Sequence, residues 1–251
     1  MMNLTQKLQH IDQLKQQLDQ HRPLPSAVVK NLHDDLILRW TYHSNAIEGN
    51  TLTLLETKVV LEGITIGGKA LREHFEAINH RDAILYVEEI IQQKEPLSEW
   101  QIRNIHHLIL KNIDNDNAGS YRHVNVIISG ATHRPPDHTQ LQEKMVGLIN
   151  WYQQHADQIH PIERAATLHA DFVGIHPFTD GNGRSSRLLM NLELMKSGYP
   201  PCVIQVDQRL RYYDALDRWH CSNDKEPFIQ LIAEAVEHAF DPYWHVLSIK
   251  P

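Results

Sequence analysis

The densest group of residues able to do chemistry lies at residues 176–187, which read HPFTDGNGRSSR. The stretch joins two helical patterns, so we expect a loop that opens the second helix. Gly181 and Gly183 allow a sharp turn that leaves backbone N–H groups facing outward, and such groups at a helix N-terminus suit a phosphate. Arg184 and Arg187 would share one side of the first helical turn, where cations oppose the macrodipole unless a polyanion lies between them.

Two further side chains in this stretch add acid–base and metal chemistry. His176 closes the preceding helix, and a reference pKa of about 6.5 lets it accept a proton at physiological pH. Asp180 would serve as a helix cap or as a carboxylate for Mg²⁺ held by phosphates. A lone histidine or an arginine pair is more often structural. Because these features fall within one short segment, we interpret it as a phosphate site with a base.

A second feature is an acidic residue at the wrong end of a helix. Apolar residues at helical spacing predict a helix over about residues 31–48, and Gly49 offers a left-handed stop. Glu48 then adds negative charge at the negative end of the macrodipole, which costs about 0.3–1 kcal/mol if exposed. A solvated surface glutamate is the plain interpretation. The alternative requires a cation elsewhere in the chain that Glu48 contacts.

The elements that must position these residues are mainly helical, so the fold class is predicted to be mostly α. Helical spacing or capping signals occur at residues 4–18, from 53 toward 63, and at 71–93, 98–109, 138–155, 161–174, 184–196 and 227–240. The apolar stripe over residues 4–18 is interpreted as core, with an intermolecular helix pair, and so a homodimer, as the open alternative.

In one segment the apolar residues follow the two-residue spacing of a strand and not the spacing of a helix. Residues 123–129, HVNVIIS, alternate in the manner of a strand, and Ser129 and Gly130 mark a turn ahead of Pro135 and Pro136. We therefore expect a small β-hairpin, the only β signal in the sequence.

The composition argues against a nucleic-acid-binding, a membrane-spanning and a disulfide-rich protein. The sequence has 24 Lys and Arg against 31 Asp and Glu, a net charge of −7, which argues against nucleic-acid binding. No apolar run is long enough for a membrane span, and Cys202 and Cys221 are too few for a disulfide framework. We expect a soluble cytoplasmic protein. The 18 histidines show no metal-ligand spacing, and His106 and His107 are interpreted as structural.

Residues 176–187 resemble the HPFx(D/E)GNGRxxR signature of Fic-domain proteins at every defining position. The likeness continues through residues 188–191 and 198–201, and residues 119–136 resemble that family's flap region. Ser44, Glu48 and Gly49 match the inhibitory motif (S/T)xxxE(G/N), as in the class with an N-terminal inhibitory helix. The resemblance implies a Fic-type helical bundle with an N-terminal helical region at residues 1–94, a Fic core at 95–240 and a C-terminal tail at 241–251.

This resemblance implies a protein adenylyltransferase that moves AMP from ATP to a Ser, Thr or Tyr hydroxyl of a target protein, with the protein itself among the candidates. His176 would be the general base, Asp180 would hold Mg²⁺, and Glu48 would pair with Arg187 in place of the γ-phosphate. Phe178 would be a buried anchor. The implied ATP-binding residues are Asp180, Gly181, Asn182, Gly183, Arg184, Ser185, Ser186, Arg187, Tyr212, Tyr213 and His220. The implied target-binding flap residues are Ile128, Ser129, Gly130, Ala131 and Thr132.

The sequence departs from the family at one position and leaves other functions open. His220 falls where close relatives often carry Asn, which puts that nucleotide contact in doubt. Glu48 could instead position a water that removes AMP from a modified protein. A nucleotide-sensing regulator without transferase activity is a further alternative. A kinase-like relative of the Doc group is disfavoured, because this sequence has both Gly183 and Arg184.

Overall fold

A computed structural model describes residues 2–249 of the chain, and within that range it contains helices and irregular segments but no strand. The predicted fold class, mostly α, is confirmed. The α-helices are α1 (Leu4–Asp19), α2 (Ser26–Ile47), α3 (Leu54–Leu61), α4 (Leu71–Gln92), α5 (Glu99–Leu110), α6 (Leu141–His155), α7 (Pro161–Ile175), α8 (Asn182–Lys196), α9 (Arg209–Ser222), α10 (Glu226–His238) and α11 (Asp241–Leu247). Short 3₁₀ turns occupy His138–Gln140, Ala156–Gln158 and Val206–Gln208.

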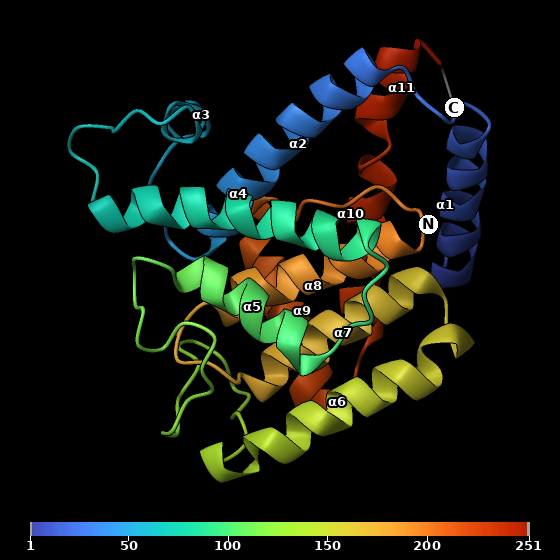
Figure 1. Ribbon diagram of the computed structural model, residues 1–251. Coiled ribbons are helices and arrows are strands. Elements are labelled where there is room, and N and C mark those ends of the chain that lie inside the picture. The colour runs from blue at the N-terminus through green and yellow to red at the C-terminus, as the bar shows by residue number, and fades with distance from the viewer. Residues whose placement is uncertain (1, 250–251) are drawn as a thin grey trace.

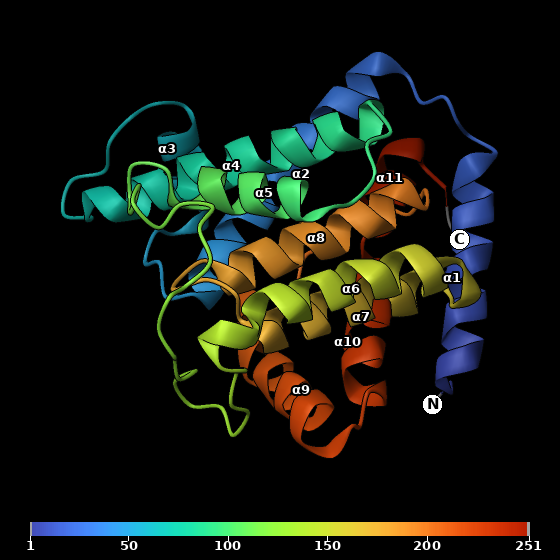
Figure 2. The same cartoon turned by 60° about the horizontal axis from the view of Figure 1, so that its bottom comes forward.

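Helix α8 lies at the centre of the molecule, with α4 and α5 on one side and α7 alongside it (Figures 1 and 2). Its residues from Arg184 to Leu194 are all buried. A buried helix must have its polar side chains partnered, and the far end of α8 follows this rule. Asn191 pairs with the backbone of Cys202 at 2.8 Å in both directions, and Glu193 accepts from Arg164. The near end of α8 carries the candidate site.

Two apolar clusters flank α8. One joins α1, α7, α9 and α10, and the other joins α4, α5, α6 and one face of α7 and α8. The stripe on α1, with Ile11 and Leu18 fully buried, packs against α10 within the first cluster. This confirms the interpretation of the stripe as core. Helix α1 stands at the edge of the molecule in both views (Figures 1 and 2).

The end of α2 and the start of α3 lie close to where the sequence signals predict. Helix α2 is longer than expected at its start, because it begins at Ser26, and it ends at Ile47 with Glu48 as its C-cap. Gly49 follows with a φ of 99°, a left-handed value that glycine adopts without strain. Thr53 and Glu56 form the predicted capping box of α3. Glu48 is therefore held at a defined helix end.

The predicted β-hairpin is wrong. Residues 123–137, which we call the flap, form an extended excursion between α5 and α6 without a strand ladder. Pro135 and Pro136 remove two N–H donors from the returning leg. The flap is instead held by side chains: Arg122 donates from Nη1 to the Val124 carbonyl at 2.8 Å and from Nη2 to the Pro136 carbonyl at 2.6 Å.

The C-terminal region predicted as a tail contains helix α11, which packs against α2. The predicted division into residues 1–94, 95–240 and 241–251 stays a prediction. Cys202 is buried and Cys221 exposed, and both are free thiols. Within residues 2–249 no helix is long and apolar enough to cross a membrane.

Candidate active site

The candidate base lies at the C-cap of α7. His176 has a φ of 51° and a ψ of 57°, so its backbone is left-handed and ends the helix. Its Nδ1 lies 3.2 Å from the Val173 carbonyl. Since a carbonyl only accepts, Nδ1 carries the proton and Nε2 keeps its lone pair. Burial lowers the pKa of His176 to about 4, so the ring is neutral at physiological pH.

The loop that follows, residues 176–181, is called the catalytic loop, and side chains from three elements fix its shape. Asn182 accepts from the Phe178 N–H at 3.0 Å and donates to the Phe178 carbonyl at 2.8 Å. The Phe178 ring is fully buried, as predicted, and stacks on His106 with centroids 3.5 Å apart. Arg122 donates from Nε to the His176 carbonyl at 2.9 Å. The backbone of the loop is thereby fixed before any ligand binds.

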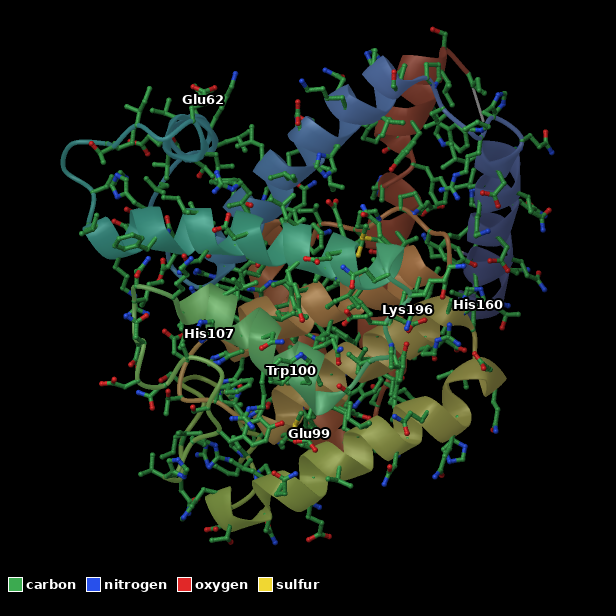
Figure 3. The ribbon with its side chains drawn as sticks, viewed as in Figure 1. Glu62, Glu99, Trp100, His107, His160 and Lys196 are labelled. Carbon is green, nitrogen blue, oxygen red and sulfur yellow. The ribbon has the colours of Figure 1, made fainter. Side chains whose placement is uncertain are left out.

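His106 also sets the position of Asp180. Its Nδ1 accepts from the Gly119 N–H and its Nε2 donates to the Asp180 carbonyl, both at 2.9 Å. Burial lowers the pKa of His106 to about 4, which keeps the ring in the neutral tautomer that can do both. The neighbouring His107 lies exposed on the outer face of α5 (Figure 3). His106 thus has the structural role that the sequence predicts, because it holds the backbone of Gly119 and Asp180 in place.

The Asp180 carboxylate lies at the mouth of the site and faces two guanidinium groups. Oδ1 accepts from Arg184 Nη2 at 3.0 Å and from the Gly181 N–H, and Oδ2 accepts from Arg72 Nη2 at 2.5 Å. Burial alone would raise the pKa of Asp180, but the charge of Arg184 leads the effects that lower it, with Arg72 adding to them. The carboxylate is therefore charged, with its side chain 43% exposed.

Arg184 is almost fully buried at the start of α8, with 2% of its side chain exposed. Its Nε and Nη1 make no hydrogen bond among the described residues, although Nη1 lies 3.6 Å from Glu76 Oε1. Unpaired buried donors on a charged group are costly. Such donors at a helix N-terminus suit a bound anion, which would satisfy both the guanidinium and the helix.

Arg187 lies one turn further along α8 and is held from α2. Its Nε donates to Ser44 Oγ at 3.0 Å, and its Nη2 donates to the Ser44 carbonyl at 2.8 Å and to Glu48 Oε1 at 2.7 Å. On its other side Nη1 lies 3.3 Å from the Tyr212 hydroxyl. Burial opposes the charge, but the Glu48 carboxylate raises the pKa of Arg187. A charge-assisted contact of this kind is among the stronger hydrogen bonds.

Glu48 also lies directly against Gly183, in the first turn of α8. A Cβ added to Gly183 would meet Glu48 Oε1 at 2.2 Å, so the carboxylate occupies the space that the missing side chain leaves open. The cation required by the position of Glu48 is therefore Arg187. The pair connects residues that are 139 positions apart in the sequence. It offsets the unfavourable placement of an acid at a helix C-terminus.

The other predicted ATP-site residues divide into those near Arg187 and those away from it. Ser185 is fully buried and its Oγ has no hydrogen-bond partner within residues 2–249, whereas Ser186 Oγ donates to the Gly183 carbonyl at 2.8 Å. Tyr213 donates to the Ile47 carbonyl at 3.1 Å, next to Glu48.

His220 lies away from both arginines. Its Nε2 donates to the Ala170 carbonyl at 2.8 Å, and its ring stacks on His133 of the flap with centroids 4.4 Å apart. The predicted flap residues directly precede His133 in the same segment. Among them Thr132 donates its N–H to Asp217 at 3.0 Å, while the turn at residues 128–131 is closed by one backbone bond of 3.2 Å.

Sequence reasoning missed three residues that shape the site. Arg72 and Arg122 contact the catalytic loop from positions 108 and 54 residues away in the sequence, and His169 contacts Tyr212, 43 residues away. His169 is fully buried and its Nε2 lies 3.0 Å from both Ser186 Oγ and the Tyr212 hydroxyl. A helical histidine at a core position, seven residues before His176, was the available signal for it. No local pattern distinguishes Arg72 or Arg122 from a surface arginine.

Comparisons with known proteins agree with this geometry. The sequence profile of the Fic/DOC family matches residues 96–194. The chain is 36% identical over 255 residues to the protein adenylyltransferase Fic of Nematostella vectensis, an alignment that covers 98% of this chain and 59% of that protein. The first curated relatives it matches are longer, and the chain spans about half to three fifths of their length.

Two solved structures are similar over nearly the whole chain. Fic-1 of C. elegans superposes with a TM-score of 0.88 at 31% identity, covering 98% of this chain and 73% of that one. A Fic-domain-containing signaling protein of Bacteroides thetaiotaomicron superposes with a TM-score of 0.87 at 30% identity, and the match covers 96% of this chain and 99% of that one. With the complete loop motif built around a buried pair of arginines, these likenesses establish that the chain belongs to the Fic/DOC family.

Proposed function

We propose that this protein is an adenylyltransferase that moves AMP from ATP to a Ser, Thr or Tyr hydroxyl of a target protein, and that Glu48 inhibits it. One observation carries the proposal. A buried arginine of the loop motif, Arg187, is occupied by a carboxylate that lies against Gly183, where phosphate would otherwise bind. The names of the relatives support the activity, although they are longer than this chain.

The nucleotide would bind at the N-terminus of α8. Arg184 offers unpaired buried donors, and Arg187 would receive the γ-phosphate once Glu48 leaves. Backbone N–H groups around Gly181 to Gly183 would add donors to the phosphates. The hydroxyl of Tyr213, on the Ile47 side of the site, would face the adenine end.

The residues present fit a magnesium ion shared with the triphosphate. Asp180 supplies a charged, partly exposed oxygen ligand, and Mg²⁺ at nucleotide sites is commonly bound through one or two carboxylates plus phosphates. Within residues 2–249 no group of three or more His, Cys, Asp or Glu side chains is placed to hold a metal ion, so the phosphates would have to supply further ligands. When bound, the ion would neutralise charge on the phosphates.

His176 would act as the general base. Because Nδ1–H is directed to the Val173 carbonyl, Nε2 is free to take the proton of the target hydroxyl. The hydroxyl oxygen would then form a bond to the α-phosphorus, and the bond from that phosphorus to the β-phosphate oxygen would break, with pyrophosphate leaving. Arg184 and the N-terminus of α8 would stabilise charge on the phosphates, and such positioning supplies most of the acceleration in phosphoryl transfer.

The flap would bind the target segment. Ile128, Ser129 and Gly130 lie at its exposed turn, and the extended backbone there can pair with an extended peptide. Because the flap is tied through Arg122 to the His176 carbonyl, a bound segment would be placed next to the base.

Incubation with labelled ATP and host lysate tests the proposal. Glu48→Gly should increase label on protein, and adding His176→Ala to that variant should remove it. Wild-type protein is the reference, and mass spectrometry should find the mass of one AMP on a hydroxyl side chain. Equal labelling by wild type and Glu48→Gly would contradict inhibition, and full labelling with His176→Ala would contradict the base.

A second function is favoured by one detail of the inhibitory contact. Glu48 binds Arg187 through Oε1, and among the described residues its Oε2 makes no hydrogen bond. That oxygen could position a water for attack on AMP attached to a protein. Wild-type protein with Mg²⁺ would then release AMP from a modified target, and Glu48→Gly would not.

A non-enzymatic nucleotide sensor, the remaining alternative, would bind ATP without either reaction. The cytoplasmic location, self-modification and a homodimer stay predictions, as does the absence of nucleic-acid and membrane partners.

A further inference from the structure

An arginine outside the loop motif contacts the carboxylate that the proposed function assigns to the metal. Arg72, in the first turn of α4, donates from Nη2 to Asp180 Oδ2 at 2.5 Å. Its Nε donates to Glu76 Oε1 at 3.0 Å, one turn further along α4. The side chain is 56% exposed, so it can move away without opening the core.

The contact uses the Asp180 oxygen, Oδ2, that has no other hydrogen-bond partner among the described residues. The other carboxylate oxygen, Oδ1, is already engaged by the Gly181 N–H and by the buried Arg184. A hard cation that binds Asp180 would therefore have to use Oδ2, the oxygen that Arg72 holds. Two cations cannot share that oxygen at contact distance without strong repulsion.

We propose that Arg72 is a further residue of the nucleotide site, a positioning residue that occupies the metal-binding oxygen of Asp180 until Mg²⁺ replaces it. The inference rests on the proposed function, since it concerns the metal that would accompany ATP. Arg72 keeps Asp180 charge-compensated and correctly placed in the free protein. It also raises the Mg²⁺ concentration that the protein needs to bind the metal–nucleotide complex.

The same turn of α4 is connected to the inhibitory helix. Glu76, the partner of Arg72, accepts from Asn50 Nδ2 at 2.9 Å, and Glu73 accepts from the Thr51 N–H at 2.7 Å. These two acceptors hold the segment that directly follows Glu48 and Gly49. Release of Arg72 from Asp180 therefore occurs beside the residues that fix the end of α2.

The test measures nucleotide binding as a function of free Mg²⁺. The probe is an ATP analogue with a methylene bridge between the α- and β-phosphates, which cannot transfer AMP, titrated by calorimetry into Glu48→Gly protein. Adding Arg72→Gln should lower the free Mg²⁺ concentration for half-maximal binding by about 1.5- to fivefold, the effect of losing one exposed ion pair. Arg72→Lys, which keeps the charge, should lie near the parent.

Arg39 provides a matched control. It pairs with Asp35 at 2.8 Å, and the side chains of that pair are 54% and 45% exposed, close to the 56% and 43% of Arg72 and Asp180. Arg39→Gln should leave the Mg²⁺ dependence unchanged. An unchanged midpoint in Arg72→Gln would overturn the inference. The inference would also be overturned if Arg72→Gln weakened binding of the ATP analogue equally at every Mg²⁺ concentration. That result would make Arg72 a phosphate ligand.

The outcomes separate this inference from the proposed function. If Glu48→Gly binds the analogue and Arg72→Gln leaves the midpoint unchanged, only the role of Arg72 fails. If Glu48→Gly binds no analogue even at saturating Mg²⁺, the nucleotide site itself fails, and the role of Arg72 fails with it.

Discussion

The catalytic loop and the flap are held in place by different means. The catalytic loop is fixed by buried neighbours, with Asn182 bonding both backbone groups of Phe178 and His106 stacked on its ring. The flap is exposed at its turn, and its contacts include those of Arg122 at its base, of Asp217 on α9, and of His133 with His220 and the Gly174 carbonyl. The first region is rigid without ligand, whereas the second relies on a few polar contacts at the surface.

Under the proposed function, this difference would separate the residues that do the chemistry from those that bind the target. Groups that must contact a transition state need fixed geometry before the reaction, and the catalytic loop supplies it from within the core. A segment that must accept an extended partner needs free backbone groups, and the flap keeps its turn at the surface. Arg122 is the bridge between them, because it bonds the His176 carbonyl as well as both legs of the flap.

The largest expected effect is the loss of AMP transfer when the proposed base, His176, is replaced. His176→Asn in Glu48→Gly protein should reduce AMP transfer by about 100- to 10,000-fold, the usual contribution of a general base. Asn tolerates the left-handed backbone of this position, so the loop and the nucleotide affinity should be retained. Rates with labelled ATP and calorimetry on the same preparation check both parts. Transfer that survives the substitution would assign the base to another group.

The next effect should be on stability. Asn182→Ala leaves the N–H and carbonyl of Phe178 buried without partners, so the free energy of unfolding should fall by about 2–4 kcal/mol. Urea unfolding followed by circular dichroism measures it. Ser185→Ala is the matched control, because Ser185 is equally buried and its Oγ is unpaired within the described chain. Equal losses in the two variants would mean that the loop is not fixed by Asn182.

A smaller effect is expected at the flap. Asp217→Ala removes the acceptor of the Thr132 and His133 N–H groups, so stability should fall by less than about 1 kcal/mol, since these groups are near water. Amide hydrogen exchange at both positions should become faster, and transfer to a protein target should fall while nucleotide binding is unchanged. Asp214→Ala, exposed on the same helix, is the control. Unchanged exchange would show that Asp217 does not hold the flap.

The smallest expected effect is that of pH on the rate of AMP transfer. Burial lowers the pKa of His176 from its usual 6.5 to about 4, so the neutral base persists down to the acid range. Transfer by Glu48→Gly protein, measured at saturating nucleotide, should change little between pH 7.5 and 5.5. An unperturbed histidine with a pKa of about 6.5 would instead cost about tenfold at pH 5.5. A drop of that size would contradict the burial effect.

Much of the site could be predicted because its residues are close in sequence. Residues 176–187 carry their own turn, helix start and charges, and Glu48 was conspicuous because it opposed the helix dipole. The flap could not be predicted as well, since alternation says nothing about whether a partner strand exists, and Pro135 and Pro136 remove donors. Arg72 is 108 positions from Asp180, so only the packing of α4 reveals it.

The helix boundaries were predictable for a similar reason. The capping box at Thr53 and the glycine stop at Gly49 act within a few residues and fix α3 and the end of α2. What local signals cannot give is which helices meet. The contact of α2 with α8, on which the Glu48–Arg187 pair depends, arises from the packing of distant segments.

Arg187 has partners other than Glu48. Ser44 on α2 accepts two hydrogen bonds from its guanidinium, and the Tyr212 hydroxyl on α9 lies 3.3 Å from Nη1. Under the proposed inhibition, activation would exchange the Glu48 carboxylate oxygen for a phosphate oxygen on Arg187. Such an exchange would need a shift at the end of α2 and no refolding of α8.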